Sequence, residues 1–287
     1  MYQRPEAAIV LTVKNAIVLL LVFCAVDATP ALAFQHNIAV IAHRGSSASA
    51  PENTLAAFMK AMTDGADMIE LDVHQSRDSQ LVVIHDETVD RTTNGKGKIK
   101  DFSYEELRKF DAGSWFRPGN FQGEHIPRLI DVAAILDSTT KILLEIKEGS
   151  RVYPDIERHV VECLLTSRLE HRVIIKSFED DVLAAVRRLR PSLPLLKVYV
   201  CQLPIVRIVV GRGFRFGSVL KDSVEYLQPH WLGLTNQFVD AAHDKGFKVF
   251  VWNVNTEARM EKMIGIGVDG IETDDPLLLR KLIPKTE

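Results

Sequence analysis

From Ile38 almost to its C-terminus, the chain alternates short apolar runs with longer stretches of helical periodicity. Eight of the runs, rich in Val, Ile and Leu, are predicted to be strands: residues 38–42, 68–73, 142–146, 173–177, 195–200, 225–228, 248–254 and 270–273. Repeated strand–helix units indicate an α/β protein with a parallel sheet. Eight such units in about 250 residues are typical of a (β/α)8 TIM barrel, although an open doubly wound sheet has similar local patterns.

The clearest predicted helix spans residues 54–63. Its apolar side chains fall at positions i, i+3, i+4 and i+7, which predicts one face packed in the core: Leu55, Phe58, Met59 and Met62. Asn53 or Thr54 is expected to cap its start.

One stretch after the second predicted strand interrupts the alternation. Residues 81–85 have the pattern of an extra short strand, and residues 88–125 are polar, contain glycine and are helical around residues 104–110. We interpret residues 81–125 as a small insertion after the second barrel strand that covers the mouth of the barrel. No change in composition marks a second domain, so residues 34–287 are predicted to form one barrel domain.

The first 33 residues differ in kind from the rest. Arg4 and Lys14 precede an uncharged apolar run, which is followed by small residues up to Ala33. This order predicts a secretory signal peptide over residues 1–33, cleaved after Ala33, and a secreted or periplasmic protein. The alternative is an uncleaved membrane anchor, but the run after Lys14 is shorter than the roughly 20 apolar residues that a spanning helix needs.

Charge and cysteine content exclude some partners and scaffolds. The formal net charge is −3, which argues against a nucleic-acid partner. The chain has 3 cysteines, Cys24, Cys163 and Cys201, which excludes a disulfide-built scaffold. The sequence leaves open whether Cys163 and Cys201 form a disulfide bond.

Polar side chains gather at or just after the C-terminal ends of the predicted strands. They are His43, Glu70, Asp72, Glu145, Lys147, Ser177, Trp252 and Asp274. Barrel enzymes carry their chemistry at this end of the strands, so the positions favour the barrel over the open sheet. No glycine-rich dinucleotide or phosphate loop follows the first predicted strand.

Glu70 and Asp72 lie one residue apart on a predicted strand, so their side chains leave the same face. Two carboxylates that face a barrel interior repel each other unless a cation or a proton lies between them. Glu145, on the next strand, is placed to supply a third oxygen. This set of ligands favours one divalent cation, Mg²⁺ or Ca²⁺, over zinc. The alternative is that the three acids are solvated strand ends or salt-bridge partners.

Two histidines follow apolar strands, His43 after residues 38–42 and His85 after residues 81–84. One such histidine alone is more often a core residue, but two beside an acid pair indicate acid–base catalysis of phosphodiester hydrolysis. Arg44 and Lys147 are expected to neutralise the phosphate oxygens. Asp86 either orients His85 or begins the next turn.

In these motifs and their order, the chain resembles the glycerophosphodiester phosphodiesterase family. The similarity covers nearly all of residues 38–280 and rests on residues 42–45, 51–54, 57–58, 65–73, 83–86, 91–93, 126–127, 145–147, 177–178, 252–254 and 270–274. Two positions depart from the family pattern. Ser79 stands where glycine is common, and Arg128 stands where a small polar residue is common, so the resemblance does not carry over the local shape of the insertion or the substrate preference.

The resemblance implies a TIM barrel that hydrolyses glycerophosphodiesters to glycerol 3-phosphate and an alcohol with a bound divalent cation. The residues that match the family's site are three metal ligands, an acid–base pair, two phosphate contacts and an aromatic side chain at the substrate pocket: Glu70, Asp72 and Glu145; His43 and His85; Arg44 and Lys147; and Trp252. For Trp252, a core tryptophan at a strand end is an equal alternative.

Residues 203–216 are apolar with interleaved arginines. They either contact an anionic membrane or, as we favour, pack as the fifth barrel helix. Membrane contact would suit a lysophospholipase D or a sphingolipid phosphodiesterase, the alternative enzyme class. A non-catalytic barrel that binds a small molecule is the third hypothesis, and the intact set of acids and histidines argues against it. The sequence leaves the oligomeric state open.

Overall fold

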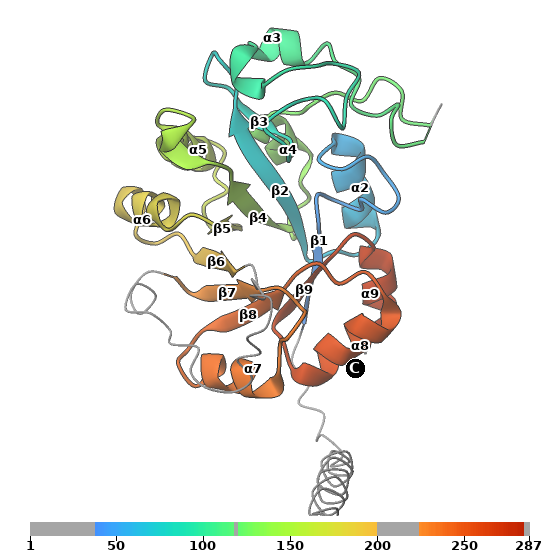
Figure 1. The fold of residues 1–287 in the computed structure, drawn as a ribbon, viewed down its shortest axis with the longest axis vertical. Coiled ribbons are helices and arrows are strands. Elements are labelled where there is room, and N and C mark those ends of the chain that lie inside the picture. Colours follow the sequence, from blue (N-terminus) through green and yellow to red (C-terminus); the bar gives the residue numbers. More distant parts are fainter. Residues whose placement is uncertain (1–37, 118–119, 200–223, 284–287) are drawn as a thin grey trace, which may run out of the picture. The chain divides into compact units, whose positions relative to one another are not determined.

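The computed structural model describes residues 38–117, 120–199 and 224–283. Eight parallel strands of this part of the chain form a closed ring (Figure 1). The strands of the ring are β1 (Ala39–Ala42), β2 (Met68–Gln75), β4 (Lys141–Ile146), β5 (Val173–Ser177), β6 (Leu195–Tyr199), β7 (Tyr226–Pro229), β8 (Lys248–Val251) and β9 (Gly270–Thr273). Strand β1 pairs with both β9 and β2, which closes the ring. The fold is therefore the predicted TIM barrel and not an open sheet.

The observed strands lie where the sequence predicts them. The largest difference is at β8, which ends at Val251 and not at residue 254. Trp252 then forms only an isolated bridge with His230.

Helices surround the ring of strands (Figure 1). In the described residues they are α2 (Leu55–Thr63), α4 (Leu129–Ile135), α5 (Ile156–Thr166), α6 (Asp180–Leu189), α7 (Asn236–His243), α8 (Glu257–Ile266) and α9 (Pro276–Leu282), with a short 3-10 helix η2 (Gly149–Arg151) before α5. The connection from β6 to β7 includes residues 200–223, which lie outside the described residues. None of the described helices combines the length and apolarity needed to cross a membrane.

The side chains of β2 alternate between two environments, as the period of a strand requires. Ile69 and Leu71 are buried in the main core, which also contains residues of the surrounding helices. Met68 belongs to a second apolar cluster, with Ile41, Leu143 and Phe250, that fills the barrel interior. Glu70 and Asp72 share the face of Met68, so this alternation directs both carboxylates into the barrel.

The observed helix α2 differs in one detail from the predicted helix. Of the two residues expected to cap the helix, Thr54 is the N-cap, and its side chain accepts a hydrogen bond from the Ala57 N–H. Phe58 is fully buried, but the prediction that Met59 packs in the core is wrong, because Met59 is 48% exposed. The helix buries a narrower stripe centred on Ala57, Phe58 and Ala61, and Met59 lines an open groove beside Tyr104.

The insertion leaves the C-terminal end of β2 (Figure 1). It contains β3 (Leu81–Val83), which pairs antiparallel with β2, a 3-10 helix η1 (Ile99–Asp101) and α3 (Tyr104–Leu107). A separate small core holds it together: Val82, Ile84, Val89, Ile99, Leu107, Ala112 and Ile126. Strand β3 ends at Val83, before the predicted end at residue 85. Helix α3 ends at Leu107, although helical structure was predicted around residues 104–110.

Three predictions concern residues outside the described ranges. They are the signal peptide over residues 1–33, the packing of residues 203–216 as a helix, and the pairing of Cys163 with Cys201.

Candidate active site

The turn after β1 has an unusual backbone. Arg44 and Gly45 both have left-handed φ angles, 56° and 84°. A Cβ atom on Gly45 would lie 2.6 Å from the backbone carbonyl carbon of Ala57, so the turn packs directly against α2 and only glycine fits. The Arg44 N–H donates to Glu70 Oε2 at 2.9 Å, which ties this turn to β2. The turn thereby holds His43 and Arg44 at the C-terminal end of the barrel.

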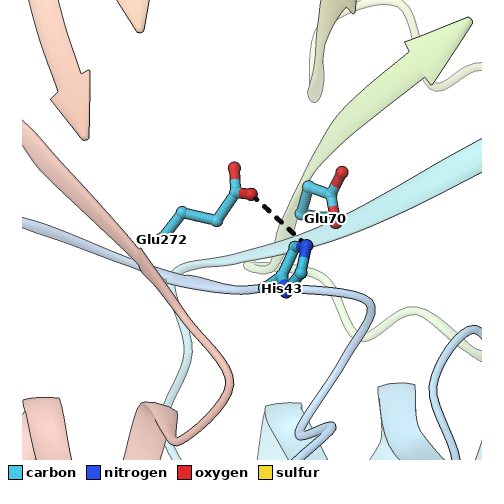
Figure 2. Close-up of side chains that lie close together, drawn as sticks. All are labelled: His43, Glu70 and Glu272. Carbon is cyan, nitrogen blue, oxygen red and sulfur yellow. Dashed lines mark ion pairs between the residues drawn. The ribbon is translucent and has the colours of Figure 1, made fainter. Parts of the chain in front are cut away.

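His43 is held by a carboxylate from a neighbouring strand end. Its Nδ1 lies 2.6 Å from Asp274 Oδ1, and its Nε2 lies 3.8 Å from Glu272 Oε1 inside the barrel (Figure 2). Burial, the largest influence, lowers the pKa of His43, but the bond to Asp274 and the charges of Glu70 and Glu272 outweigh it and raise the pKa. With Nδ1–H directed to Asp274, Nε2 is the ring nitrogen that faces Glu272 in the barrel interior.

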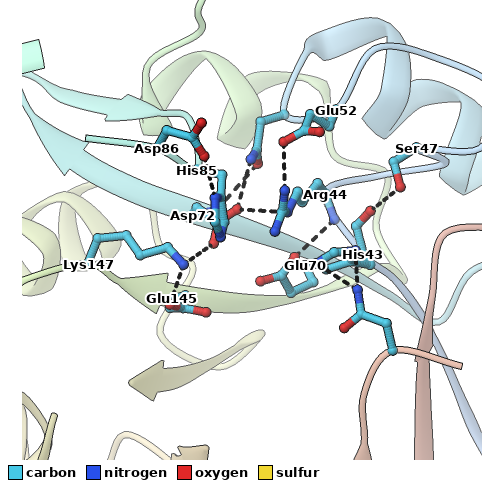
Figure 3. A network of polar contacts seen from close by, with 12 residues as sticks. His43, Arg44, Ser47, Glu52, Glu70, Asp72, His85, Asp86, Glu145 and Lys147 are labelled. Carbon is cyan, nitrogen blue, oxygen red and sulfur yellow. Dashed lines mark hydrogen bonds and ion pairs between the residues drawn. The ribbon is translucent and has the colours of Figure 1, made fainter. Parts of the chain in front are cut away.

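His85 lies after β3 and is held in the same way. Its Nδ1 lies 2.7 Å from Asp86 Oδ1 (Figure 3). Arg91 Nε donates to Asp86 Oδ2 at 2.8 Å and fixes this carboxylate. Asp86 therefore orients His85, the first of the two roles considered for it. Burial lowers the pKa of His85, with a further contribution from the positive charge of Lys147, although Asp72 and Asp86 raise it.

Three predicted metal ligands meet inside the barrel. Glu70 and Asp72 leave the same face of β2, and Glu145 lies opposite Asp72 in the register of β4. Each offers a ligand oxygen, and these oxygens all lie within 4.8 Å of one another. All three side chains are buried. Spacing and burial suit one ion coordinated by oxygen.

The charge state of the carboxylates also indicates a cation. Burial raises the pKa of Glu70 to about 7, although Lys176 opposes this shift. Burial also raises the pKa of Asp72, but Lys147 and Arg44 outweigh it and hold the pKa well below its usual range. Glu70 Oε1 is buried and lies 2.7 Å from the ammonium nitrogen of Lys176. Three buried carboxylates whose oxygens lie within 4.8 Å of one another fit a divalent metal, and we treat the cluster as a candidate divalent-metal site.

Both predicted phosphate contacts lie at the rim of this cluster (Figure 3). Lys147 Nζ lies 2.9 Å from Asp72 Oδ1 and 2.5 Å from Glu145 Oε1. Arg44 Nη1 donates to Glu52 Oε1 at 2.7 Å, and its Nε lies 3.5 Å from Asp72 Oδ2. The structure therefore places two cations against the buried carboxylates.

Trp252 stands apart from the charged cluster, in an aromatic group at the ends of β5, β7 and β8. It packs edge to face on Phe178 and His230, at ring distances of 5.8 and 5.3 Å. Its Nε1 is buried without a hydrogen bond in the described structure.

Sequence reasoning assigned no role to several residues of this site. Lys176 bridges Glu70 and Glu272, Gln228 donates to Glu272, and the Asn253 amide lies 2.7 Å from His43 Nδ1. A signal was present in the sequence, because Lys176 and Glu272 are each a lone charged residue within an apolar strand.

The closed barrel and the site at its C-terminal end define the class of protein. It is a barrel enzyme with acid–base groups and cations arranged for phosphate-ester chemistry. The model of the Glycerophosphoryl diester phosphodiesterase family matches residues 43–278. The chain is also 43% identical over 247 residues to the glycerophosphodiester phosphodiesterase of Caldanaerobacter subterraneus subsp. tengcongensis, covering 86% of this chain and 98% of the relative.

Solved structures share the fold. A phosphodiesterase of Oleispira antarctica, solved with the product sn-glycerol-3-phosphate, matches with a TM-score of 0.74 and 29% identity over 85% of this chain and 95% of that one. A glycerophosphodiester phosphodiesterase of Agrobacterium tumefaciens matches with a TM-score of 0.70 and 26% identity over 85% and 99%. The chain belongs to the glycerophosphoryl diester phosphodiesterase family and is an enzyme of the phosphoric diester hydrolase class.

Proposed function

We propose that this protein hydrolyses glycerophosphodiesters to glycerol 3-phosphate and an alcohol, with one divalent cation held by Glu70, Asp72 and Glu145. One observation carries the proposal. His43 beside Glu70 and His85 beside Asp72, each held by a carboxylate through Nδ1, stand on either side of a buried carboxylate cluster (Figure 3). The activity named for the relatives supports it.

The two histidines divide the proton transfers. Hydrolysis needs a base for the attacking hydroxyl group and an acid for the leaving alkoxide. The pKa of His43 is raised, which favours the protonated acid, and the pKa of His85 is lowered, which favours the base. His43 therefore protonates the leaving oxygen, and His85 accepts the proton of the nucleophile.

The nucleophile is the glycerol hydroxyl group next to the phosphate. Its oxygen bonds to phosphorus as His85 takes its proton, and the bond from phosphorus to the alcohol oxygen breaks as His43 protonates that oxygen. Water then opens the cyclic phosphate, with the roles of the two histidines reversed. Reaction in ¹⁸O-labelled water with no cyclic species at any time would contradict this route.

Arg44 and Lys147 bind the phosphate oxygens and balance the charge that builds on them. A bound divalent cation supplies further charge stabilisation, and the carboxylate ligands suit Mg²⁺ or Ca²⁺. Trp252 contributes to the pocket for the alcohol, which is consistent with its unpartnered Nε1.

The deciding experiment uses metal-depleted protein with glycerophosphocholine, glycerophosphoethanolamine or lysophosphatidylcholine, and restores Mg²⁺ or Ca²⁺ separately. We expect turnover of the first two substrates only with a restored ion. Turnover of none, or turnover indifferent to chelator, contradicts the proposal. Preference for lysophosphatidylcholine favours a lysophospholipase D instead, with membrane contact through residues 203–216.

We also propose that residues 1–33 direct secretion and are removed. The basic flank and the apolar run of the sequence support this. The intact mass of the exported protein should correspond to a chain that begins at Phe34, and retention of residue 1 in the membrane fraction would indicate an anchor.

A further inference from the structure

Lys176 is a buried cation at the centre of the barrel that the proposed proton transfers do not use. It comes from β5, and its side chain is 5% exposed. Its Nζ lies 2.7 Å from Glu70 Oε1, 3.2 Å from Glu272 Oε2 and 3.4 Å from Glu145 Oε2. Two of these three carboxylates are proposed ligands of the divalent cation, so the ammonium group competes with a bound ion for their charge.

Glu272 is the one carboxylate of these three that is not a proposed ligand of the divalent cation. It comes from β9, its side chain is 1% exposed, and it accepts a hydrogen bond from Gln228 Nε2 at 2.7 Å. When Glu70 and Glu145 coordinate a divalent cation, the carboxylate of Glu272 still neutralises the positive charge of Lys176. A buried ammonium group without such a partner would be costly.

Glu272 also belongs to a second group of potential ligands. His43, Glu70 and Glu272 each offer one ligand atom, and these atoms lie within 4.8 Å of one another (Figure 2). Glu70 is common to this group and to the proposed site. The geometry thus provides two adjoining cation sites, and Lys176 Nζ contacts two of the three members of the second.

We propose that Lys176 takes the place of a second cation and so limits the cluster to one divalent ion. This positioning role rests on the proposed cation site. Lys147 is the useful contrast, because it contacts Asp72 and Glu145 but is 14% exposed at the rim, where its ammonium group can turn to a phosphate. Lys176 is enclosed by carboxylates and has no such route.

The test is calorimetric titration of the folded, metal-depleted protein with Ca²⁺ and with Mg²⁺, which counts ions without measuring turnover. We expect the unaltered protein to bind one ion and Lys176→Met to bind two. Glu272→Gln should still bind one, about tenfold more weakly, because Lys176 is then left to Glu70 and Glu145 alone. The double variant, which loses both charges of the pair, should return to one ion.

Lys197→Met is the matched control, since Lys197 lies half-way along β6 and pairs with Asp180 outside the cluster. It should not change the number of ions. A folded Lys176→Met variant that binds only one ion, at whatever affinity, overturns the proposal. If circular dichroism shows that this variant does not fold, Glu272→Gln decides, and unchanged or tighter binding there overturns the proposal.

The outcomes also separate this inference from the proposed function. An unaltered protein that binds one ion and hydrolyses substrate, with a Lys176→Met variant that still binds one, refutes only the role of Lys176. An unaltered protein that binds no ion refutes the proposed cation site itself.

Discussion

Asp274 Oδ1 lies 2.6 Å from Nδ1 of His43, although 231 positions separate the two residues in the chain. Adjacent strands, β9 and β1, bring them together where the barrel closes. Ser47 and Asn255 in turn bond to Asp274 and hold its carboxylate in place. Closure of the barrel therefore sets the orientation and charge of one histidine of the proposed acid–base pair.

Asp274→Asn should lower the pKa of His43, because the amide lacks the negative charge that stabilises the imidazolium ion. If His43 is the acid, activity is lost as the pH rises through its pKa. The alkaline limb of the pH profile of kcat/KM should thus move to lower pH, by about one unit. Asp240→Asn, at an exposed position on α7, serves as the control. An alkaline limb that stays in place would remove His43 from the acid role.

Asp86→Asn should move the opposite limb. The bond to Asp86 raises the pKa of His85, so its loss lowers that pKa further. If His85 is the base, activity rises as the pH rises through its pKa, and the acid limb should move to lower pH. Loss of orientation should also reduce kcat by about 10²-fold. A pH profile in which this variant moves the alkaline limb would exchange the roles of the two histidines.

His43→Ala and His85→Ala should each abolish turnover and largely keep divalent-cation binding, because neither imidazole is a proposed ligand of the ion. Assays of glycerophosphocholine hydrolysis and calorimetry with Ca²⁺ measure the two properties separately. His171→Ala is the control, since the side chain of His171 is 84% exposed. Measurable turnover in either active-site variant would mean that water or another residue transfers the proton.

Glu70→Ala should lose both properties. Its carboxylate belongs to the proposed ligand set, and its Oε2 also accepts the Arg44 N–H that holds the turn after β1. Calorimetry should show no cation binding at concentrations that saturate the unaltered protein. Glu87→Ala, at a half-exposed position of the insertion, is the control. Retained cation binding in Glu70→Ala would remove Glu70 from the ligand set.

The fold was predictable because its signals are local. Each apolar run and each change of period lies within a few residues, and the eight predicted strands are the strands of the ring. Met59 shows the limit of such reasoning. Spacing places it on the apolar face of α2, but the insertion next to α2 leaves an open groove there, which only the tertiary arrangement determines.

The candidate site was predictable where charged residues follow strands in motifs. Lys176 and Glu272 were missed because each is one charged residue within an apolar strand, 96 positions from the other. Their contact depends on strands β5 and β9 facing each other across the barrel interior. A sequence-based search could have asked which buried charges must pair once a closed barrel is predicted.

Gly45→Ala tests the backbone that carries His43. The substitution places a Cβ atom 2.6 Å from the Ala57 carbonyl carbon at a φ of +84°. Gly246→Ala is the matched control, because its φ is +82° but nothing lies within 4 Å of the added atom. The control should lose about 1 kcal/mol of unfolding free energy in urea from the left-handed backbone alone. Gly45→Ala should lose about 1–3 kcal/mol more from the displacement of α2, with reduced kcat as His43 moves. Equal losses in the two variants would show that the turn and α2 can separate without strain.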